Sequence, residues 1–365
     1  MLIGLKSPGL YLQGANILRE LYKYVGEFGK KALIILSPSG MQRHGEALLS
    51  GLKTSDFLCR FEETKAECCR AEIDRIAAEA RADLPDMVIG VGGGKILDIA
   101  KAAAHTLHLP CVIIPTVAST DAPCSSMSVL YTPDGVFEGY SFLDRGPDVV
   151  LVDTDIIMHT PASLFSAGMG DAMSTYFEAR AVNRSGSPNQ IRMRPTAAAY
   201  ALGKCCHEIL LEYGEAALNC IKNQEPGMAL ERVVEANTYL SGVGFESGGV
   251  AAAHALSKGM TAVPALHKKA HGEAVAFCTL VQLCLEHADN AELNELLSFL
   301  HMASLPTTFA DLTSEPVSEA EWMAAAEFTC RPGMTIHKMP FEVTPQMLLE
   351  AIYRADEIGR AGAYL

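Results

Sequence analysis

The sequence has few basic residues for its length, and it lacks a long apolar run. It holds 29 Lys and Arg against 43 Asp and Glu, which gives a formal net charge of −14 at pH 7. A nucleic-acid surface needs clustered Lys and Arg, so we expect no nucleic-acid partner. No run of 18 apolar residues occurs, and the apolar part of Met1–Pro8 is too short for a signal peptide. We therefore expect no membrane span and a cytoplasmic protein.

The cysteines form neither a disulfide scaffold nor a metal motif. There are eleven, an odd number, and none shows C-x-x-C spacing, although Cys68-Cys69 and Cys205-Cys206 are adjacent pairs. Secreted scaffolds use an even number at regular spacings, whereas cytosolic proteins keep their thiols reduced. The sequence therefore predicts reduced, mostly buried thiols.

The 365 residues suit two domains, and the first 160 alternate short β-branched runs with helical patterns. This alternation predicts an α/β, Rossmann-like domain with a parallel sheet over residues 1–160. Residues 127–142 alternate around a Pro133-Asp134-Gly135 turn, which predicts a β-hairpin over the ligand cleft. We expect strands near 32–36, 87–89, 111–114 and 149–152, and helices at about 16–27, 40–53, 71–82 and 96–106.

From Pro161 onward the strand signals vanish, and long Ala- and Leu-rich helical patterns replace them. These patterns predict an all-α domain over residues 161–365. Ligands of open α/β sheets bind outside the carboxyl ends of the strands, so we expect the site in the cleft between the domains. The predicted helices lie at about 162–183, 195–222, 228–241, 247–259, 271–287 and 344–358.

A glycine loop follows the apolar run Met87–Ile89 and leads into a helical pattern. Glycines let the backbone approach a ligand, and the free N–H groups of a helix N-terminus favour a phosphate. The third glycine of G-x-G-x-x-G would fall on Lys95, and the G-K-[ST] ending of a P-loop is missing. The loop therefore predicts a diphosphate site without naming the nucleotide. The alternative is a strand-to-helix turn that binds nothing.

Three residues of the second domain are candidate metal ligands: Asp171, His254 and His271. Each lies among small residues at a predicted helix. A carboxylate and two neutral imidazoles suit a catalytic divalent metal that keeps one position open. Their spacing matches no short zinc signature, and each histidine alone is also compatible with a core or capping role.

The whole chain resembles the zinc-dependent glycerol dehydrogenases of the iron-containing alcohol dehydrogenase superfamily. The resemblance implies the dehydroquinate synthase-like fold. It is carried by stretches that occur in the same order along the chain: Ser7-Pro8 with Tyr11-Leu12-Gln13-Gly14, the glycine loop with Asp98 and Lys101, Pro115-Thr116 through Ser119-Thr120-Asp121-Ala122-Pro123, Phe177-Glu178-Ala179-Arg180, Glu235-Ala236-Asn237-Thr238, Gly244-Phe245-Glu246-Ser247-Gly248-Gly249, His271-Gly272-Glu273 and Thr335-Ile336-His337.

This resemblance implies that Asp171, His254 and His271 bind Zn²⁺. The iron enzymes of the superfamily carry a further histidine four residues after the aspartate, and Thr175 stands there, which favours three ligands and zinc. The resemblance also implies a set of residues that bind NAD: Ser37, Gly92, Gly93, Gly94, Lys95, Asp98, Thr116, Ser119, Ser125, Met127 and Tyr131.

The implied activity is hydride transfer from glycerol, or a related vicinal diol, to NAD, which yields dihydroxyacetone or the corresponding hydroxyketone. By the same resemblance, Asp121 meets substrate hydroxyls and Phe245 walls the pocket. A carboxylate there would select polyols, although Asp121 is also an ordinary turn residue. The resemblance further implies a homo-oligomer, an octamer, acting on a small polyol.

Two positions depart from the family pattern. Ser37 stands where NAD users carry an aspartate against the adenosine ribose, so NADP is not excluded, and Arg43 is a candidate for its phosphate. Ser257 replaces a histidine one turn after His254 that could relay the alcohol proton. His267 or a water on Ser257 is the candidate substitute, and Lys268 and Lys269 are either a solvated run or an anion site.

Three other functions remain open. A lyase such as dehydroquinate synthase would need several Lys and Arg in the cleft, and the cleft motifs nearly lack them. A related NAD(P)-dependent reductase of a small 2-oxo acid or hydroxyketone is the second. A nucleotide-binding protein with lapsed activity is the third, and the retention of all three metal ligands argues against it.

Overall fold

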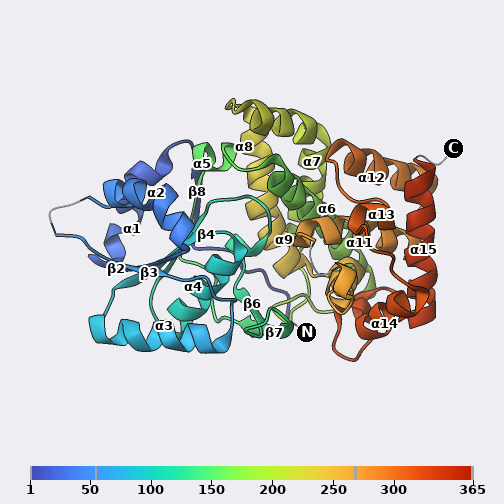
Figure 1. Ribbon diagram of the computed structural model, residues 1–365, viewed down its shortest axis with the longest axis horizontal. Coiled ribbons are helices and arrows are strands. Elements are labelled where there is room, and N and C mark those ends of the chain that lie inside the picture. Colours follow the sequence, from blue (N-terminus) through green and yellow to red (C-terminus); the bar gives the residue numbers. More distant parts are fainter. Residues whose placement is uncertain (1, 54–55, 267–268, 363–365) are drawn as a thin grey trace.

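The computed structural model describes residues 2–53, 56–266 and 269–362. An α/β half occupies one end of the molecule and a helical half the other, with the β6–β7 hairpin between them (Figure 1). Six parallel strands form one sheet in the order β1-β8-β5-β4-β2-β3, as predicted for the first domain. The sheet strands are β1 (Leu10–Gly14), β2 (Lys31–Leu36), β3 (Leu58–Glu63), β4 (Met87–Gly92), β5 (Cys111–Pro115) and β8 (Val149–Asp153), and the hairpin strands are β6 (Met127–Tyr131) and β7 (Phe137–Phe142).

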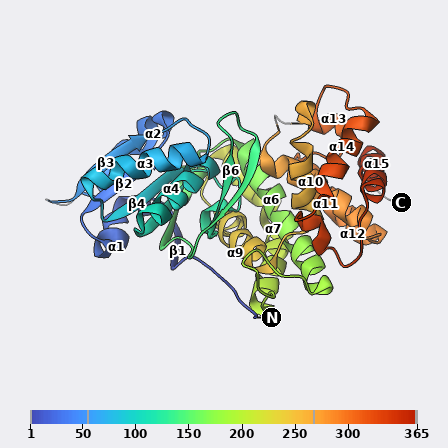
Figure 2. The same cartoon turned by 90° about the horizontal axis from the view of Figure 1, so that it is seen from below.

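Helices cover both faces of the sheet (Figure 2). Side chains alternate along a strand, so Ile34 of β2 faces one layer while Leu33 faces the other. The first layer packs on α1 and α2, and the second on α3 and α4. The helices of this half are α1 (Leu21–Val25), which lies between 3₁₀ turns at Ile17–Glu20 and Gly26–Phe28, α2 (Pro38–Gly51), α3 (Arg70–Asp83), α4 (Gly94–Leu107), a 3₁₀ turn at Ala122–Cys124, and α5 (Thr154–Met158).

The second half of the described chain is helical, and α6 runs through its centre. This helix packs against α7, α9 and α11, and most of its side chains are buried. The helices here are α6 (Ala162–Ser185), α7 (Ala197–Asn223), α8 (Met228–Glu235), a π-helical turn (Ala236–Leu240), α9 (Ser241–Gly248), α10 (Ala252–Met260), a 3₁₀ turn (Pro264–Leu266), α11 (His271–Leu285), α12 (Asn290–Met302), α13 (Phe309–Leu312), α14 (Glu319–Thr329), a 3₁₀ turn (Thr335–Lys338) and α15 (Pro345–Ala361).

The N-terminal segment ties the hairpin to the helical half. The backbone N–H of Lys6 donates to Ser247 Oγ of α9 at 3.0 Å. Its ammonium donates to Ser126 Oγ and to the Leu143 carbonyl, which flank the two hairpin strands. Glu246 of α9 also accepts the backbone N–H of Ser126 at 2.9 Å. The base of the hairpin is therefore bonded both to α9 and to the start of the chain.

Several predicted elements differ from the structure. The predicted helix at 247–259 is wrong at its start, because α9 ends before Gly249, whose φ of 98° lies outside the helical region. The predicted helix at 16–27 is a short α-helix between two 3₁₀ turns. Strands β1 and β3 and helices α5, α12, α13 and α14 were not predicted. The domain boundary at 160/161 stays a prediction, although every strand of the described residues precedes it.

The expectation for the cysteines is confirmed, since all eleven are free thiols and six are buried. Within the part of the chain that the structure describes, none of the helices combines the length and the apolar character needed to span a bilayer.

Candidate metal and cofactor site

The three predicted metal ligands meet at one point. Asp171 comes from the middle of α6, His254 from α10 and His271 from the first residue of α11. One ligand atom of each lies within 4.8 Å of the other two. Asp171 Oδ1 is 3.5 Å from His254 Nε2 and 3.3 Å from His271 Nε2. These distances leave an ion-sized gap between one carboxylate oxygen and two imidazole nitrogens.

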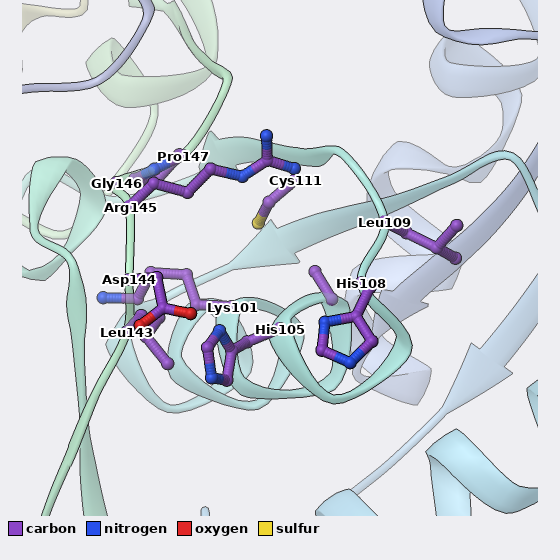
Figure 3. A pocket seen from close by; sticks show the side chains of 11 residues that line it. Lys101, His105, His108, Leu109, Cys111, Leu143, Asp144, Arg145, Gly146 and Pro147 are labelled. Atoms are coloured by element: carbon purple, nitrogen blue, oxygen red, sulfur yellow. The ribbon is translucent and has the colours of Figure 1, made fainter.

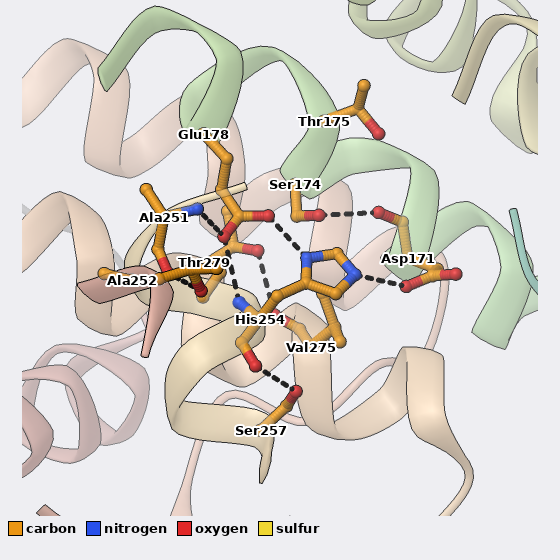
Figure 4. A network of polar contacts seen from close by, with 12 residues as sticks. Asp171, Ser174, Thr175, Glu178, Ala251, Ala252, His254, Ser257, Val275 and Thr279 are labelled. Carbon is orange, nitrogen blue, oxygen red and sulfur yellow. Dashed lines mark hydrogen bonds and ion pairs between the residues drawn. The ribbon is translucent and has the colours of Figure 1, made fainter. Parts of the chain in front are cut away.

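Glu178 fixes the orientation of His254 (Figure 4). Its Oε2 lies 2.5 Å from His254 Nδ1, while Oε1 accepts the backbone N–H groups of His254 and Ala251. A carboxylate only accepts, so Nδ1 carries a proton and Nε2 is the ring nitrogen that faces Asp171. This arrangement, in which a carboxylate holds the far side of a histidine, is typical of metal-binding imidazoles.

The donor set fits a divalent cation. Asp171 Oδ1 is buried without a hydrogen bond among the described residues, and it forms a close pair with His254 Nε2 at 3.5 Å. Such a pair needs positive charge between its members. Burial lowers the pKa of His254, but Glu178 and Asp171 outweigh it and raise that pKa well above its usual value, so a proton serves when no metal is bound. A metal ion would displace this proton.

Close packing of α6 on α11 brings His271 within reach of Asp171. A Cβ on Gly272 would lie 1.8 Å from the Ala167 carbonyl oxygen of α6. Only glycine allows this approach, which explains the glycine directly after the histidine. Gly168 has the same role on the other side of α6, where a Cβ would lie 1.9 Å from the Ala118 carbonyl oxygen.

Thr175, at the position of the extra histidine of the iron enzymes, is not a ligand in this arrangement. Its hydroxyl is buried and lies 2.9 Å from Ser241 Oγ, on the side of α6 that packs against α7 and α9. Figure 4 shows it turned away from His254 and Asp171. The described residues therefore supply three metal ligands at this point.

One cavity of about 300 Å³ joins two of the candidate metal ligands, His254 and His271, to the glycine loop. It includes Tyr140 of the hairpin, and Phe245 lies along the wall with its ring stacked on His254 at 6.4 Å between centroids. The cavity brings together most of the predicted site residues: Gly94, Lys95, Asp98, Asp121, Ser125, Met127, Tyr131, Phe245, His254 and His271.

The glycine loop has room for a ligand. Gly93 is the N-cap of α4, and it supplies no side chain to the free N–H groups of the first turn. A Cβ on Gly93 or Gly94 would meet its nearest neighbour at 3.4 Å, which is ordinary contact, so packing alone does not demand glycine there. A bare backbone at a helix N-terminus beside a cavity fits the diphosphate of a dinucleotide.

Asp98 stabilises the wall of this cavity. Its Oδ1 pairs with Lys101 at 2.9 Å, and Oδ2 accepts the Val129 backbone N–H at 3.0 Å. The buried Lys101 ammonium also donates to Ser125 Oγ and to the Ala122 carbonyl. The pair thus holds the loop before the hairpin in place.

The other predicted cofactor residues lie outside the lining of this cavity. Gly92 ends β4 opposite Pro115 of β5, so Gly93 and Thr116 emerge at the same sheet edge. Ser37 follows β2 at that edge and caps α2 through the Gly40 N–H at 3.0 Å. Ser119 lies on the loop between Thr116 and Asp121. Their contacts with a cofactor stay predictions.

Sequence reasoning missed Glu178, Gln190, Lys258 and Lys338. Glu178 had a signal in the sequence, because it lies two helical turns after Asp171, on the same face of α6, with no charged residue between them. The candidate proton relay His267 and Lys268 lie outside the described residues. Lys269 does not line the cavity and lies 4.0 Å from Glu273.

A separate cavity of about 340 Å³ lies beside the C-terminal end of α4 (Figure 3). His105 and His108 line one side, with ring centroids 6.4 Å apart, and Arg145 lines another. Of the predicted site residues, none lines this cavity.

We expect Glu178→Gln to weaken zinc binding by about 10- to 100-fold. The amide cannot accept from His254 Nδ1 and from both backbone N–H groups at once, so either a bond is lost or the imidazole shifts its proton to Nε2. Competition with a chromogenic chelator measures the affinity. Glu292→Gln, which alters a carboxylate on α12 paired with Arg180, is the control. Unchanged zinc affinity in Glu178→Gln would contradict the positioning role.

We expect Gly272→Ala to lower the free energy of unfolding by about 1–3 kcal/mol and to weaken zinc binding, because the new methyl group forces α11 away from α6. Urea unfolding and the same chelator competition measure both effects. Gly14→Ala adds a methyl group where no atom lies within 4 Å and should change neither quantity. A zinc affinity like that of the parent protein would show that the close approach does not set the ligand geometry.

Comparisons with known proteins agree with this site. Residues 8–154 match the family model described as iron-containing alcohol dehydrogenase. The chain is 44% identical to glycerol dehydrogenase of Pseudomonas putida over 98% of each chain, and 41% identical to that of Thermotoga maritima over 97% of this chain and 96% of the other. The crystal structure of a probable glycerol dehydrogenase from Sinorhizobium meliloti 1021 superposes with a TM-score of 0.93 at 37% identity, over 98% of this chain and 99% of the other. The chain therefore belongs to the glycerol dehydrogenase family within the iron-containing alcohol dehydrogenases.

Proposed function

We propose that this chain oxidises glycerol, or a closely related vicinal diol, to dihydroxyacetone or the corresponding hydroxyketone, with NAD as hydride acceptor and zinc as the metal. Four curated glycerol dehydrogenases at 41–44% identity over nearly the whole chain support this substrate. The observation that carries the proposal is a single cavity, because two of the three candidate metal ligands, His254 and His271, line the same space as the bare N-terminus of α4.

The reaction moves a hydride from the carbinol carbon to the nicotinamide ring and releases the hydroxyl proton to water. Family membership implies a nicotinamide cofactor and a metal ion. A bound divalent ion supplies a positive charge that polarises the alcohol oxygen. The residues of the chain position the reactants: the glycine loop holds the diphosphate, and the hairpin side chains close the cavity from the side.

Asp121 is suited to recognise a second hydroxyl of the substrate. Its side chain lines the cavity, and its Oδ2 is buried without a hydrogen-bond donor among the described residues. Burial and the nearby Asp171 carboxylate raise the pKa of Asp121 well above its usual value. A diol hydroxyl that bonds to this carboxyl group offsets the cost of its burial, which favours polyols over simple alcohols.

Zinc rather than iron is favoured by the donor set. Three protein ligands, one carboxylate and two imidazoles, are typical of a catalytic zinc site that keeps one position for substrate or water. The fourth protein ligand of the iron enzymes is replaced by Thr175, whose hydroxyl lies beside Ser241.

The proton path runs without the histidine that relatives use. Ser257 lines the cavity, and its hydroxyl donates to the His254 carbonyl at 3.1 Å. Its oxygen still accepts a hydrogen bond, so a water held there is the proposed carrier of the alcohol proton.

We propose NAD as the preferred cofactor, while Ser37 leaves NADP possible, since the serine hydroxyl caps α2 and brings no negative charge. Arg43 lies one helical turn after Ser39 on α2 and donates to Ser39 Oγ at 3.4 Å. The cytoplasmic location and the octameric assembly stay predictions.

We expect zinc removal by a chelator to abolish NAD reduction with glycerol, and added zinc to restore it. Initial rates of NADH formation measure both steps. Asp171→Asn should show no zinc-dependent rate while NADH binding, followed by fluorescence, persists, because the substitution removes a ligand charge at the metal and leaves the glycine loop intact. A glycerol-dependent rate that survives complete stripping would refute the metal role, and full activity of Asp171→Asn would refute the ligand assignment.

We expect Ser37→Asp to lower the ratio of kcat/KM for NADP to that for NAD by about 10-fold or more, because a carboxylate repels the 2′-phosphate. Aspartate is also a good N-cap, so α2 should persist. Ser318→Asp makes the same change at the N-cap of α14 and is the control. An unchanged ratio would show that Ser37 does not face the adenosine ribose.

A further inference from the structure

Two lysines lie near the end of the cavity that His254 lines, and the proposed glycerol reaction uses neither of them. Lys258 belongs to α10, one helical turn after His254, so both side chains lie on the same face of that helix and both line the cavity. Lys338 ends the Thr335–Lys338 turn and reaches the cavity wall through Gln190. Both lysines are half-buried.

Lys258 has no carboxylate partner within the described ranges of the chain. Its Nζ lies 4.7 Å from the centre of the Tyr140 ring on the hairpin. An aromatic face attracts a cation but does not neutralise it. The contact therefore holds the ammonium over the cavity and leaves its charge available.

Lys338 is likewise without an ion pair in the part of the chain that the structure covers, and its Nζ donates to Gln190 Oε1 at 2.6 Å. Burial, together with the positive charge of Lys258, lowers the pKa of Lys338 to about 8, and the Glu178 carboxylate offsets this effect only in part. The influence of Lys258 means that two like charges lie near each other in a partly desolvated place. Such an arrangement is unfavourable until a negative group joins it.

Gln190 adds a third donor. It is only 9% exposed and lines the cavity, and its backbone N–H donates to the Glu246 carbonyl. An ammonium can only donate, so Oε1 faces Lys338 and the Nε2 amide group remains as a donor. None of the described residues accepts a hydrogen bond from Nε2.

Together Lys258, Lys338 and Gln190 form what we call the cationic subsite. Within it, Lys258 lies one helical turn after the candidate metal ligand His254. A neutral triol brings no negative charge to these two lysines, whereas a carboxylate accepts from several donors at once. The cavity of about 300 Å³ lies between the α4 N-terminus and the metal ligands, so it leaves space for a short substrate only.

We propose that the cavity preferentially binds a small hydroxy acid, a compound whose reacting hydroxyl lies at the metal ligands and whose carboxylate lies at the cationic subsite. This inference rests on the proposed dehydrogenase function and replaces the neutral polyol by a polyol acid such as glycerate. Oxidation of glycerate transfers the C2 hydride to NAD⁺ and releases the C2 hydroxyl proton to water, which yields the 2-oxo acid and NADH.

Binding is measured apart from turnover, on zinc-loaded enzyme saturated with NADH, in which an alcohol cannot react. Calorimetric titration should give a Kd for glycerate at least about 10-fold lower than that for glycerol. Lys258→Met should raise the glycerate Kd about 10-fold or more and change the glycerol Kd by less than about threefold. Lys258→Arg should restore most of the glycerate affinity, because it keeps the charge.

Lys204→Met is the matched control, since Lys204 is exposed on α7 and pairs with Glu208. Lys338→Met gives a second, independent test of the subsite. Equal affinity for glycerate and glycerol, or the same loss for both compounds in Lys258→Met, would overturn the inference. Tighter binding of glycerol 3-phosphate than of glycerate would overturn the choice of a carboxylate.

Rates of NADH formation separate this inference from the proposed function. Oxidation of glycerol with no preferential binding of glycerate overturns the inference and leaves the proposed function standing. Binding and oxidation of glycerate without oxidation of glycerol supports the inference and overturns glycerol as the substrate.

Discussion

The close packing of α6 against its neighbours is the constraint on which the site depends. This helix carries Asp171 and Glu178 on one face, two turns apart, and both act on residues of other helices. Asp171 reaches His271 only because Gly272 lets α11 approach the α6 backbone. Glu178 reaches His254 and accepts the N–H groups at the start of α10. The ligand geometry is therefore a property of helix spacing more than of any single side chain.

The same helix links the two halves of the molecule. On its other side, Gly168 lies against the loop that follows β5, and the Asp121 backbone N–H on that loop donates to Asp171 Oδ2 at 3.1 Å. Asp171, a candidate metal ligand, is thus hydrogen-bonded to the loop that leads into the wall of the cavity. This contact couples the proposed metal site to the cavity proposed for the dinucleotide, as hydride transfer from a metal-held alcohol to a bound cofactor would require.

The sequence was informative where local patterns decide structure, and less so where partners come from distant segments. Apolar runs predicted the central strands, but β1 and β3 are edge strands with exposed and polar positions, such as the Glu62-Glu63 end of β3. The helices α12 and α14 begin at the capping residues Asp289 and Ser318, a signal that could have been used.

The site divides in the same way. The glycine loop could be predicted from the sequence as a diphosphate site because its residues are consecutive. Asp171 and His271 are 100 positions apart, so spacing could not join them, and the resemblance to a family did. The hydrogen bond between Lys338 and Gln190 joins residues 148 positions apart, and neither spacing nor the family resemblance predicted it. It depends on how the Thr335–Lys338 turn packs against α10.

The bonds of the N-terminal segment limit how the cleft can open. Lys6 joins the base of the hairpin to α9, and Ser126 is bonded to Glu246 of the same helix. While these bonds persist, the base of the hairpin and α9 keep their relative positions. Opening of the cavity to a ligand would therefore displace the opposite wall, the glycine loop with the sheet behind it, before the base of the hairpin.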